Sequence, residues 1–511
     1  MKKITPNILA RCCLLALTLF AFTVFADVKL PPIISNHMVL QAGERVPIWG
    51  SASPNEKITI EIGGQKLSTQ ANANGDWSVQ VEPLKSGSKL TLTVSGTNRI
   101  VVSDVLAGEV WLGSGQSNMG MQVSRANNFE AEKAVADFPE IRMFTVASKA
   151  STNALDECQG SWRVCNSNTV GIFSATLYFF GRELHQRLKV PVGLIHSSWG
   201  GTPIEAWTRE AVVKSLPSYP AFLEHKKKEV ADWPEREKKV IADLAAWEKA
   251  VVAAKAAHKP EPLKPGQPAQ PESGQYMPGQ LYNAMIHPLI RYRIRGAIWY
   301  QGEANASGGA IGAANYTDLQ CLMIASWRQD WGLGEFPFYF VQLPNFNSPG
   351  DRSSNSWAFF REGQANVLKV PNTAMAVTID IGETNNIHPR NKQEAGRRVA
   401  LLALAKTYQQ NVVCHGPEFS KMEITGADIK IVFSHTDGGL VAHGDSLKGF
   451  VVAGADNNWH PANARIEGDA VILSSQEAPH PAAARYDWAN LPDGNLFNGV
   501  GLPAMPFRTD H

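Results

Sequence analysis

Short runs of alternating apolar and polar positions fill the first part of the chain. Four runs carry the pattern: VPIWGSA, KITIEI, DWSVQV and KLTLTVSG. They are rich in Val, Ile and Thr, and turn signals such as Gly63-Gly64 and Asn74-Gly75-Asp76 separate them. A period of two indicates strands that bury one face, because successive side chains of a strand point to opposite sides. We therefore predict an N-terminal β-sandwich domain over residues 27–103.

After Ser103 the pattern changes, and apolar strand-like runs alternate with helical stretches. The strand candidates are residues 105–113, 190–201, 293–303, 336–344 and 373–383. The helical candidates are residues 174–188, 316–331 and 390–408. Strands that alternate with helices indicate a parallel α/β sheet, which we expect over residues 104–410. Ligands bind beyond the carboxyl ends of the strands in such sheets, so the loops after these strands are the places to look for chemistry.

Two segments depart from the α/β pattern. Residues 210–275 are rich in Lys, Glu and Ala and then in Pro, and apolar positions recur there at helical spacing: Val240, Leu244, Trp247 and Val251. This segment is expected to be a solvated helical insertion without a chemical role. From residue 411 the chain again shows short strands and many turns, which predicts a C-terminal β domain over residues 411–511.

The first 26 residues carry the pattern of a secretory signal peptide. Lys2, Lys3 and Arg11 precede an apolar run, and Val24-Phe25-Ala26 places small residues at the cleavage positions. The alternative is a membrane anchor, but the run of about 15 apolar residues is shorter than the ~20 that span a bilayer. We expect a secreted or periplasmic protein without stable membrane insertion after cleavage.

Composition and charge restrict the class of protein. Apolar residues make up 44% of the chain and charged residues 19%, which is typical of a globular protein with several domains. Loss of residues 1–26 removes three cations and no acids, and so changes the formal charge from +1 to −2. No block of like charge indicates nucleic acid or an anionic membrane as a partner.

The cysteines do not form a disulfide framework or a metal site. Two of the six precede residue 27, which leaves Cys158, Cys165, Cys321 and Cys414. Cys158 and Cys165 are close enough in sequence for a local bridge, and four independent thiols are the alternative. No cysteine pair has zinc-ligand spacing and no H-E-x-x-H pattern occurs, so neither a metal nor another cofactor is expected.

The stretch EVWLGSGQSNMGMQV, residues 109–123, joins a buried strand to a glycine-rich loop. The loop is not a P-loop, because no Lys follows Gly120, and it fits neither G-x-G-x-x-G nor G-x-S-x-G. Ser117 is therefore either a structural turn residue or a nucleophile at the active-site edge of the sheet.

The groups that a serine nucleophile needs occur at other predicted strand ends. His388 follows one strand and precedes a helix, so it should lie on the same edge as Ser117 and could take its proton. Gly200 and Gly201 follow a second strand, where backbone N–H groups can approach a developing oxyanion. Gln301 and Asn305 follow a third and are candidate side-chain donors. For each group the alternative is a structural turn.

With these residues the sequence resembles the sialate O-acetylesterases of the SGNH hydrolase superfamily. GQSNM, SSWGGTPIEAW, WYQGEANA and IHPRNKQEAGRR resemble the family's blocks and occur in its order. The resemblance implies Ser117 as nucleophile, Gly200 or Gly201 as oxyanion donor and His388 as base. It also implies a flavodoxin-like three-layer α/β/α hydrolase domain with attached β domains, which removes O-acetyl groups from sugars.

Two positions depart from the superfamily pattern. Asn385 stands where an Asp is expected three residues before the catalytic His, and it cannot supply a negative charge. Asp380 or Glu383 could take that role, or the site could work as a Ser–His dyad. Ala304 stands where the third block places an Asn, so Gln301 is the first candidate for the side-chain oxyanion donor and Asn305 the second.

The expected function is hydrolysis of acetyl esters on a carbohydrate, with O-acetylated sialic acids as the first candidate substrates. An esterase acting on acetylated xylan or another hemicellulose would use the same residues, since fold and catalytic groups do not fix the sugar. A non-catalytic carbohydrate-binding protein is the remaining alternative, and it would leave the Ser, Gly, Gln and His residues of the strand ends unexplained.

Overall fold

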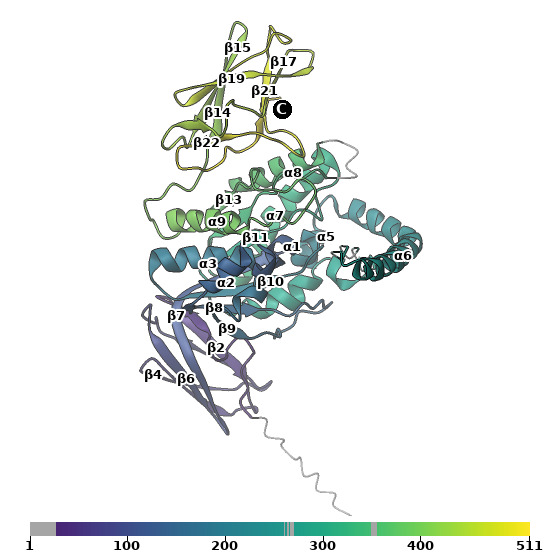
Figure 1. The fold of residues 1–511 in the computed structure, drawn as a ribbon. Helices are drawn as coiled ribbons and strands as arrows, with labels where there is room; N and C mark the ends of the chain where they lie inside the picture. The colour runs from purple at the N-terminus through teal and green to yellow at the C-terminus, as the bar shows by residue number, and fades with distance from the viewer. Residues whose placement is uncertain (1–26, 260, 263–264, 266–269, 349–354, 511) are drawn as a thin grey trace, which may run out of the picture.

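The computed structural model describes residues 27–259, 261–262, 265, 270–348 and 355–510. The signal peptide predicted for residues 1–26 lies outside this range. Figure 1 shows β-strands at one end of the molecule, a sheet covered by helices in the middle, and further β-strands at the other end. The chain is a mixed α/β protein with additional β-sheets.

Residues 27–115 form the N-terminal strands. They are β1 (Val39–Gln41), β2 (Val46–Ser51), β3 (Lys57–Ile62), β4 (Gln65–Gln70), β5 (Asp76–Val81), β6 (Lys89–Ser95) and β7 (Arg99–Gly115). The alternation in the sequence appears as burial: β3 buries every second residue, with Ile58, Ile60 and Ile62 inside. β2 pairs with β5, and β3 lies between β4 and β6, all antiparallel.

Strand β7 joins these strands to the central sheet. Its first part pairs with β6 and β1, and its second part lies between β10 and β11. One continuous buried core accordingly extends from Val28 to Leu404. The position of Ser117, two residues after β7, is thus fixed by a strand that is held along its whole length.

The central sheet has the strand order β13-β12-β11-β7-β10-β8-β9. Its further strands are β8 (Phe138–Thr145), β9 (Trp162–Cys165), β10 (Val192–Ser198), β11 (Gly296–Tyr300), β12 (Phe338–Val341) and β13 (Thr373–Ala376). Neighbours pair in parallel except for the edge strand β9, which is antiparallel. Every residue of β10, β11 and β12 is buried, as expected for strands covered on both faces.

Helices connect the strands of this sheet. They are α1 (Ser117–Gly120), α2 (Phe129–Ala134), α3 (Ala175–Leu188), α4 (Ile204–Trp207), α5 (Glu210–Lys214), α6 (Tyr219–Ala256), α7 (Gly309–Trp331), α8 (Ser356–Ala365) and α9 (Lys392–Lys406). Short 3₁₀ or π turns occur at Val123–Arg125, Val170–Ile172, Gly274–Tyr276, Tyr282–Ile286, His287–Leu289 and Asn366–Lys369. α3 packs against α9, and α7 against α8. The predicted helix 316–331 begins seven residues earlier than expected, at Gly309.

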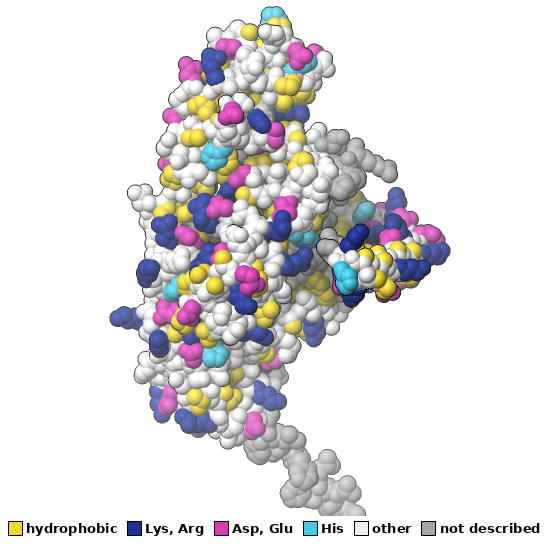
Figure 2. Space-filling view, in the orientation of Figure 1, with side chains coloured by type: hydrophobic (Ala, Val, Ile, Leu, Met, Phe, Trp, Pro, Cys, Tyr) yellow, Lys and Arg dark blue, Asp and Glu magenta, His cyan; other side chains and the backbone are white. Residues whose placement is uncertain are grey.

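The predicted insertion contains the long helix α6, which projects from the side of the molecule (Figure 1). Its apolar stripe is half-buried, as the helical spacing predicts, and the Trp247 indole donates to the Pro262 carbonyl at 2.8 Å. Figure 2 shows basic and acidic side chains side by side over this helix. In all, none of the described helices has the length and hydropathy needed to cross a membrane.

The C-terminal strands have their own buried core, formed by residues between Ile429 and Phe507. The strands are β14 (Glu418–Thr425), β15 (Asp428–Ser434), β16 (Leu440–Ala442), β17 (Phe450–Ala453), β18 (Trp459–Pro461), β19 (Asn463–Glu467), β20 (Ala470–Ser474), β21 (Ala483–Tyr486), β22 (Leu496–Asn498) and β23 (Phe507–Arg508). They pair antiparallel, most of them in the sheets β14-β15-β20-β19 and β18-β17-β21-β23.

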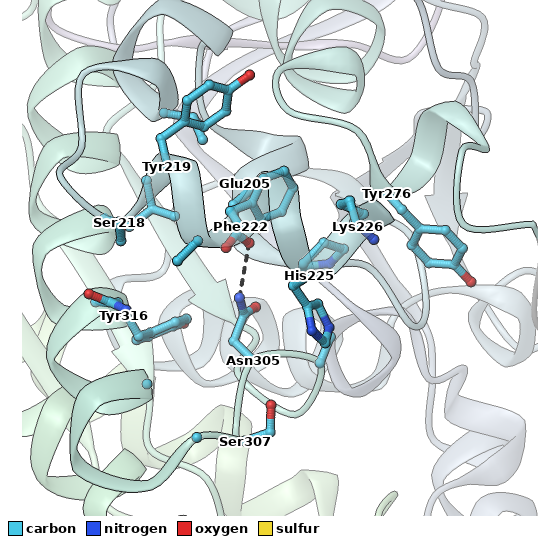
Figure 3. A pocket seen from close by; sticks show the side chains of 18 of the residues that line it. Glu205, Ser218, Tyr219, Phe222, His225, Lys226, Tyr276, Asn305, Ser307 and Tyr316 are labelled. Atoms are coloured by element: carbon cyan, nitrogen blue, oxygen red, sulfur yellow. Dashed lines mark hydrogen bonds between the residues drawn. The ribbon is translucent and has the colours of Figure 1, made fainter. Parts of the chain in front are cut away.

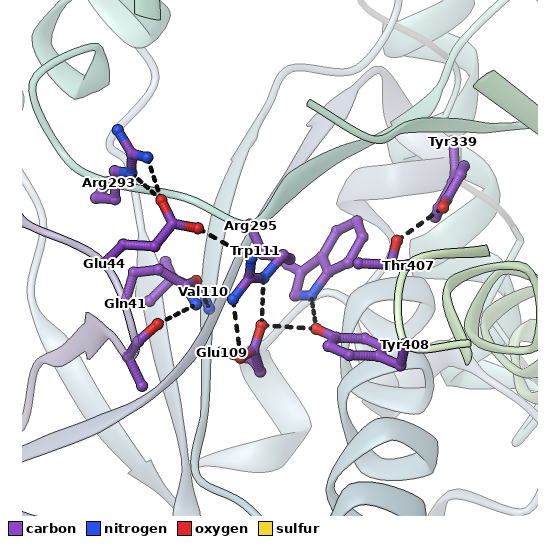
Figure 4. A network of polar contacts seen from close by, with 11 residues as sticks. Gln41, Glu44, Glu109, Val110, Trp111, Arg293, Arg295, Tyr339, Thr407 and Tyr408 are labelled. Carbon is purple, nitrogen blue, oxygen red and sulfur yellow. Dashed lines mark hydrogen bonds and ion pairs between the residues drawn. The ribbon is translucent and has the colours of Figure 1, made fainter. Parts of the chain in front are cut away.

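A polar network surrounds Glu109, where β7 begins to pair with β10, away from Ser117 (Figure 4). The Arg295 guanidinium donates to Glu109 at 2.7 Å and to Glu44 at 2.9 Å. The Tyr408 hydroxyl, which follows α9, also donates to Glu109 at 2.8 Å. The network therefore ties β7, the start of β11, the β1–β2 turn and the end of α9 together, away from the candidate site.

The structure decides between the two alternatives for the cysteines. Cys158, Cys165, Cys321 and Cys414 are all free thiols. Burial raises the pKa of both the Cys158 and the Cys165 thiol to about 12, so these two side chains behave as small apolar core residues.

Candidate active site

Ser117 lies at a sharp turn between β7 and the short helix α1. Gly115 has a φ of +135°, and a Cβ atom there would lie 2.1 Å from the Tyr300 carbonyl oxygen of β11. The Gln116 N–H then donates to the same carbonyl at 3.0 Å. Only glycine fits this close approach of two strands, and the turn leaves Ser117 partly exposed between buried neighbours.

The structure brings His388 to Ser117. His388 Nε2 lies 2.8 Å from Ser117 Oγ, a hydrogen-bond distance, although 271 residues separate the two. Side chains hold the loop of His388: Asn386 Oδ1 accepts from the His388 N–H at 3.1 Å, and Asn118 donates to the Ile387 carbonyl at 2.9 Å. The two residues can exchange a proton without rearrangement.

A second Ser–His pair occurs at the end of β10. His196 Nε2 lies 2.6 Å from Ser198 Oγ, but both residues are only 8% exposed. Burial lowers the pKa of His196 to about 4. A substrate reaches Ser117 more readily than this enclosed pair.

Neither acid candidate stands behind His388. Asp380 forms a bidentate ion pair with Arg398, at 2.6 and 2.7 Å. Asn385 is exposed to solvent. Glu383 instead binds Arg390 and Asn386. Among the described residues, Nδ1 of His388 has no hydrogen-bond partner. Neither Asp380 nor Glu383 is therefore placed to act as the acid of a catalytic triad.

The surroundings of His388 favour its neutral form. Burial lowers the pKa of His388 to about 4, and the positive charges of Lys392 and Arg125 act in the same direction. At neutral pH the ring is therefore unprotonated and able to accept a proton from Ser117.

Of the two glycines after β10, Gly200 is the one against Ser117. A Cβ atom on Gly200 would lie 3.2 Å from Ser117 Cβ, whereas the position beside Gly201 is open. Within the described part of the chain, the N–H groups of Ser117 and Gly200 donate to no protein acceptor. Both are available to a negatively charged oxygen beside Ser117.

The amides of Gln301 and Asn305 are used inside the protein. The Gln301 side chain is fully buried and donates to Gln116 Oε1, the Thr202 carbonyl and Asn305 Oδ1, at 3.1, 3.2 and 2.8 Å. Asn305 donates to Glu205 at 2.9 Å. The expectation that either amide points at an oxyanion is therefore not met. Both brace the loops after β10 and β11, because a buried amide must satisfy its own donors.

Residues 107–241 and 269–407 match the model of a carbohydrate esterase family, the sialic acid-specific acetylesterases. The match covers more than half of the chain. The chain belongs to this family.

Relatives of this esterase align over nearly its whole length. The sialate O-acetylesterase of Rattus norvegicus is 29% identical over 526 residues, which cover 93% of this chain and 93% of that protein. The sialate O-acetylesterase of Pongo abelii is 30% identical, over 93% of this chain and 91% of its own. The crystal structure of a carbohydrate acetylesterase from Xanthomonas citri has a TM-score of 0.81 and 33% identity, covering 94% of this chain and 99% of that one.

Three residues of the esterase site were missed from the sequence: Asn118, Glu303 and Lys392. Lys392 Nζ, fully buried, donates to Asn118 Oδ1 at 2.5 Å, and Asn118 donates in turn to Glu303 and to the loop of His388. Burial lowers the pKa of Lys392 to about 7 and raises that of Glu303. Asn118 and Glu303 lie within the motifs GQSNM and WYQGEANA, which could have marked them as site residues. The sequence pattern around Lys392 is that of an ordinary first turn of a helix.

Proposed function

We propose that this carbohydrate O-acetylesterase works by a serine mechanism in which Ser117 is the nucleophile and His388 the base. The 2.8 Å contact between Ser117 Oγ and His388 Nε2 is the observation that carries the proposal. Its location at the carboxyl ends of β7 and β13, beside the unengaged N–H of Gly200, supports it.

In the first half of the reaction, His388 Nε2 takes the proton of Ser117 as its Oγ attacks the acetyl carbonyl. The oxygen of that carbonyl becomes negative, and the N–H groups of Ser117 and Gly200 donate to it. When the ester bond breaks, His388 returns the proton to the departing sugar oxygen, which leaves as a hydroxyl. Ser117 then carries the acetyl group.

In the second half, His388 takes a proton from water, whose oxygen attacks the acetylated Ser117, and acetate leaves as Ser117 regains a proton. We propose that His388 acts without a carboxylate partner, as a Ser–His dyad. Asn386 and Asn118 fix its loop, and a low pKa keeps its ring neutral. No step draws on Gln301, Asn305, Asp380 or Asn385.

We propose O-acetylated sialic acids as the substrates, since the family and the rat and Pongo relatives carry that specificity in their names. Acetylated xylan is the second candidate, because the similar Xanthomonas citri structure is described only as a carbohydrate acetylesterase. Acetate release from O-acetylated sialic acid and from acetylated xylo-oligosaccharides would separate the two.

The SGNH hydrolase fold is part of the proposal. Taken without β8 and β9, the sheet has the order β10-β7-β11-β12-β13, which in chain order is the flavodoxin-like 2-1-3-4-5. Trp111 of β7 packs on Phe180 of α3, and Trp299 of β11 packs on Trp327 of α7. In the β7–β11 register these tryptophans fall on opposite faces, which supports a three-layer α/β/α arrangement of residues 104–410.

The Ser117→Ala variant tests the mechanism. We expect loss of at least ~10³-fold in kcat against 4-nitrophenyl acetate, because nothing else in the site can form the acetyl intermediate. A fluorophosphonate probe should label the parent protein and not the variant. A variant with parental activity, or a parent that takes no label, would leave the non-catalytic carbohydrate-binding alternative standing.

We also propose export, by cleavage after Ala26 of the signal peptide read in residues 1–26. Sequencing the N-terminus of the protein purified from a periplasmic or culture fraction should give Asp27 as the first residue. An uncleaved N-terminus in the cytoplasmic fraction would contradict this.

A further inference from the structure

A large pocket lies next to the loop that follows β10, and the helical insertion forms one of its walls. It encloses about 670 Å³ between one face of α6, the loops after β10 and β11 and the first turns of α7. Figure 3 shows Glu205, His225 and Lys226 in its lining, with Asn305 hydrogen-bonded to Glu205. Its size is typical of a small-molecule site.

The pocket adjoins the candidate nucleophile through two loops. Gly201 lines the pocket, and its neighbour Gly200 packs against Ser117. Ala304 also lines it, next to Glu303, which binds the Asn118 that follows Ser117. The pocket thus adjoins the two loops that pack against Ser117 and Asn118.

One face of α6 carries the charges of the pocket. Phe222, His225, Lys226 and Glu229 have the i, i+3, i+4, i+7 spacing that places side chains on the same side of a helix. Lys226 Nζ donates to Glu229 at 2.6 Å and lies over the Tyr276 ring, 5.4 Å from its centroid. The Lys226 side chain is only 17% exposed. Its ammonium group is thus held in place, with donors left over after the bond to Glu229.

The pocket lining holds two cations, Lys226 and Arg236, and two carboxylates, Glu205 and Glu229. Lys226 and Glu229 offset one another, and Glu205 accepts a hydrogen bond from the Asn305 amide at 2.9 Å. Arg236 lies one further heptad along α6, and no ion pair neutralises it within the described part of the chain. His225 also contacts Glu229, at 3.5 Å. Arg236 and the spare donors of Lys226 are therefore the groups that a negatively charged substituent can meet here.

We propose that this pocket selects acetylated sugars that bear a carboxylate, and that Lys226 on the insertion helix α6 binds that carboxylate. The insertion then determines which sugar the esterase accepts, while Ser117 and His388 perform the reaction. This inference rests on the proposed function and restricts its substrates to sugars with a carboxylate. A sialic acid carries one, and a xylo-oligosaccharide carries none. Arg236, at the outer end of the same face, attracts the anion toward the pocket.

Two substrates that differ only in charge test the proposal: an O-acetylated sialic acid and its carboxamide, in which the carboxylate is neutral. Acetate release gives kcat and KM for each. The parent protein should prefer the acid by about tenfold or more in kcat/KM, as expected for one charge-assisted hydrogen bond. Lys226→Gln should abolish that preference by raising KM for the acid.

Two further variants make the result specific. Glu229→Gln frees Lys226 from its partner, so it should lower KM for the acid only. Lys238→Gln removes the same kind of i, i+3 pair on α6, with Glu235 at 2.7 Å, away from the pocket, and should change nothing. A parent protein without the preference, or a Lys226→Gln variant that keeps it, would overturn the proposal. Hydrolysis of 4-nitrophenyl acetate in either case would leave the serine mechanism intact, so the two failures are distinguishable.

Discussion

At the scale of single residues, the basicity of His388 governs the pH range of the enzyme. The folded protein disfavours the protonated ring, so its pKa lies near 4 and not near the ordinary 6.5. A general base works only when unprotonated. We expect kcat/KM to stay high down to about pH 5 and to fall below it, measured with a neutral ester. An acid limb with an apparent pKa near 6.5 would show that the ring is not shielded in this way.

Lys392 contributes to this shift from within the protein. Its charge lowers the pKa of His388, and its own pKa near 7 means that it loses much of this charge in mildly alkaline solution. Lys392→Met should move the acid limb of kcat/KM to higher pH. Lys406→Met, at the other end of α9, is the control that should leave the limb unchanged. An unmoved limb in a folded Lys392→Met protein would assign the low pKa of His388 to burial and Arg125, without Lys392.

At the scale of elements, the stability of the α/β part depends on the network that joins Glu109 of β7 to Arg295, just before β11. Arg295→Met leaves Glu109, only 9% exposed, without its guanidinium partner. Removing one member of a buried ion pair costs about 3 kcal/mol. We expect a lower urea midpoint with little change in kcat, because this network lies where β7 enters the central sheet, and Ser117 lies where β7 leaves it.

An exposed ion pair is the matched comparison for Arg295. The Arg45 and Glu82 side chains, 68% and 55% exposed, also join two segments of the N-terminal strands. Arg45→Met should cost less than about 1 kcal/mol, because water screens exposed pairs. Equal losses in the two variants would mean that burial of Glu109 carries no special cost.

The elements that the sequence predicts correctly are those with continuous apolar runs, such as β10 and β11, and those with a clear helical period, such as α3 and α9. β8 and β9 were missed. The β8 segment carries Pro139, which disfavours a strand, and the charged residues Glu140 and Arg142. Arg142 is nevertheless buried, because Asp104, 38 residues away, neutralises it. The pairing of distant charges is invisible to a local pattern.

The same limit applies to the candidate site. Ser117 and His388 could be placed together, because parallel strands end at one edge and motifs mark both residues. Asp380 could not be excluded, since only the folded chain shows that Arg398 on α9 occupies its carboxylate. Nothing in the sequence predicts that the Gln301 side-chain amide is engaged in internal hydrogen bonds, or that the insertion lines a pocket.

At the scale of the whole molecule, the C-terminal strands dock on α8 through buried charges. The Arg361 guanidinium, 1% exposed, donates to the Pro344 carbonyl at 3.2 Å and to Ala489 in the loop after β21. Asp487, 3% exposed, begins the same loop and accepts from the Gly494 N–H at 2.8 Å. Its Oδ2 meets no hydrogen-bond donor among the described residues. The junction thus contains a carboxylate that is poorly satisfied when ionised.

This carboxylate makes the stability of the junction depend on pH. Burial raises the pKa of Asp487 to about 7, above its ordinary 3.8. Between these values the folded protein binds more protons than the unfolded one, so stability is greatest at low pH and is lost as pH rises through 7. Asp487→Asn cannot ionise, and should therefore be more stable than the parent at pH 8, by at least about 1 kcal/mol.

Urea unfolding at pH 5 and pH 8 measures the effect. The parent should lose stability between the two pH values, and Asp487→Asn should lose less. Asp445→Asn, at an exposed position of the same C-terminal part, should follow the parent. If Asp487→Asn and the parent lost stability equally, Arg361 would be compensating the ionised carboxylate fully, and the C-terminal strands would be held equally well at both pH values.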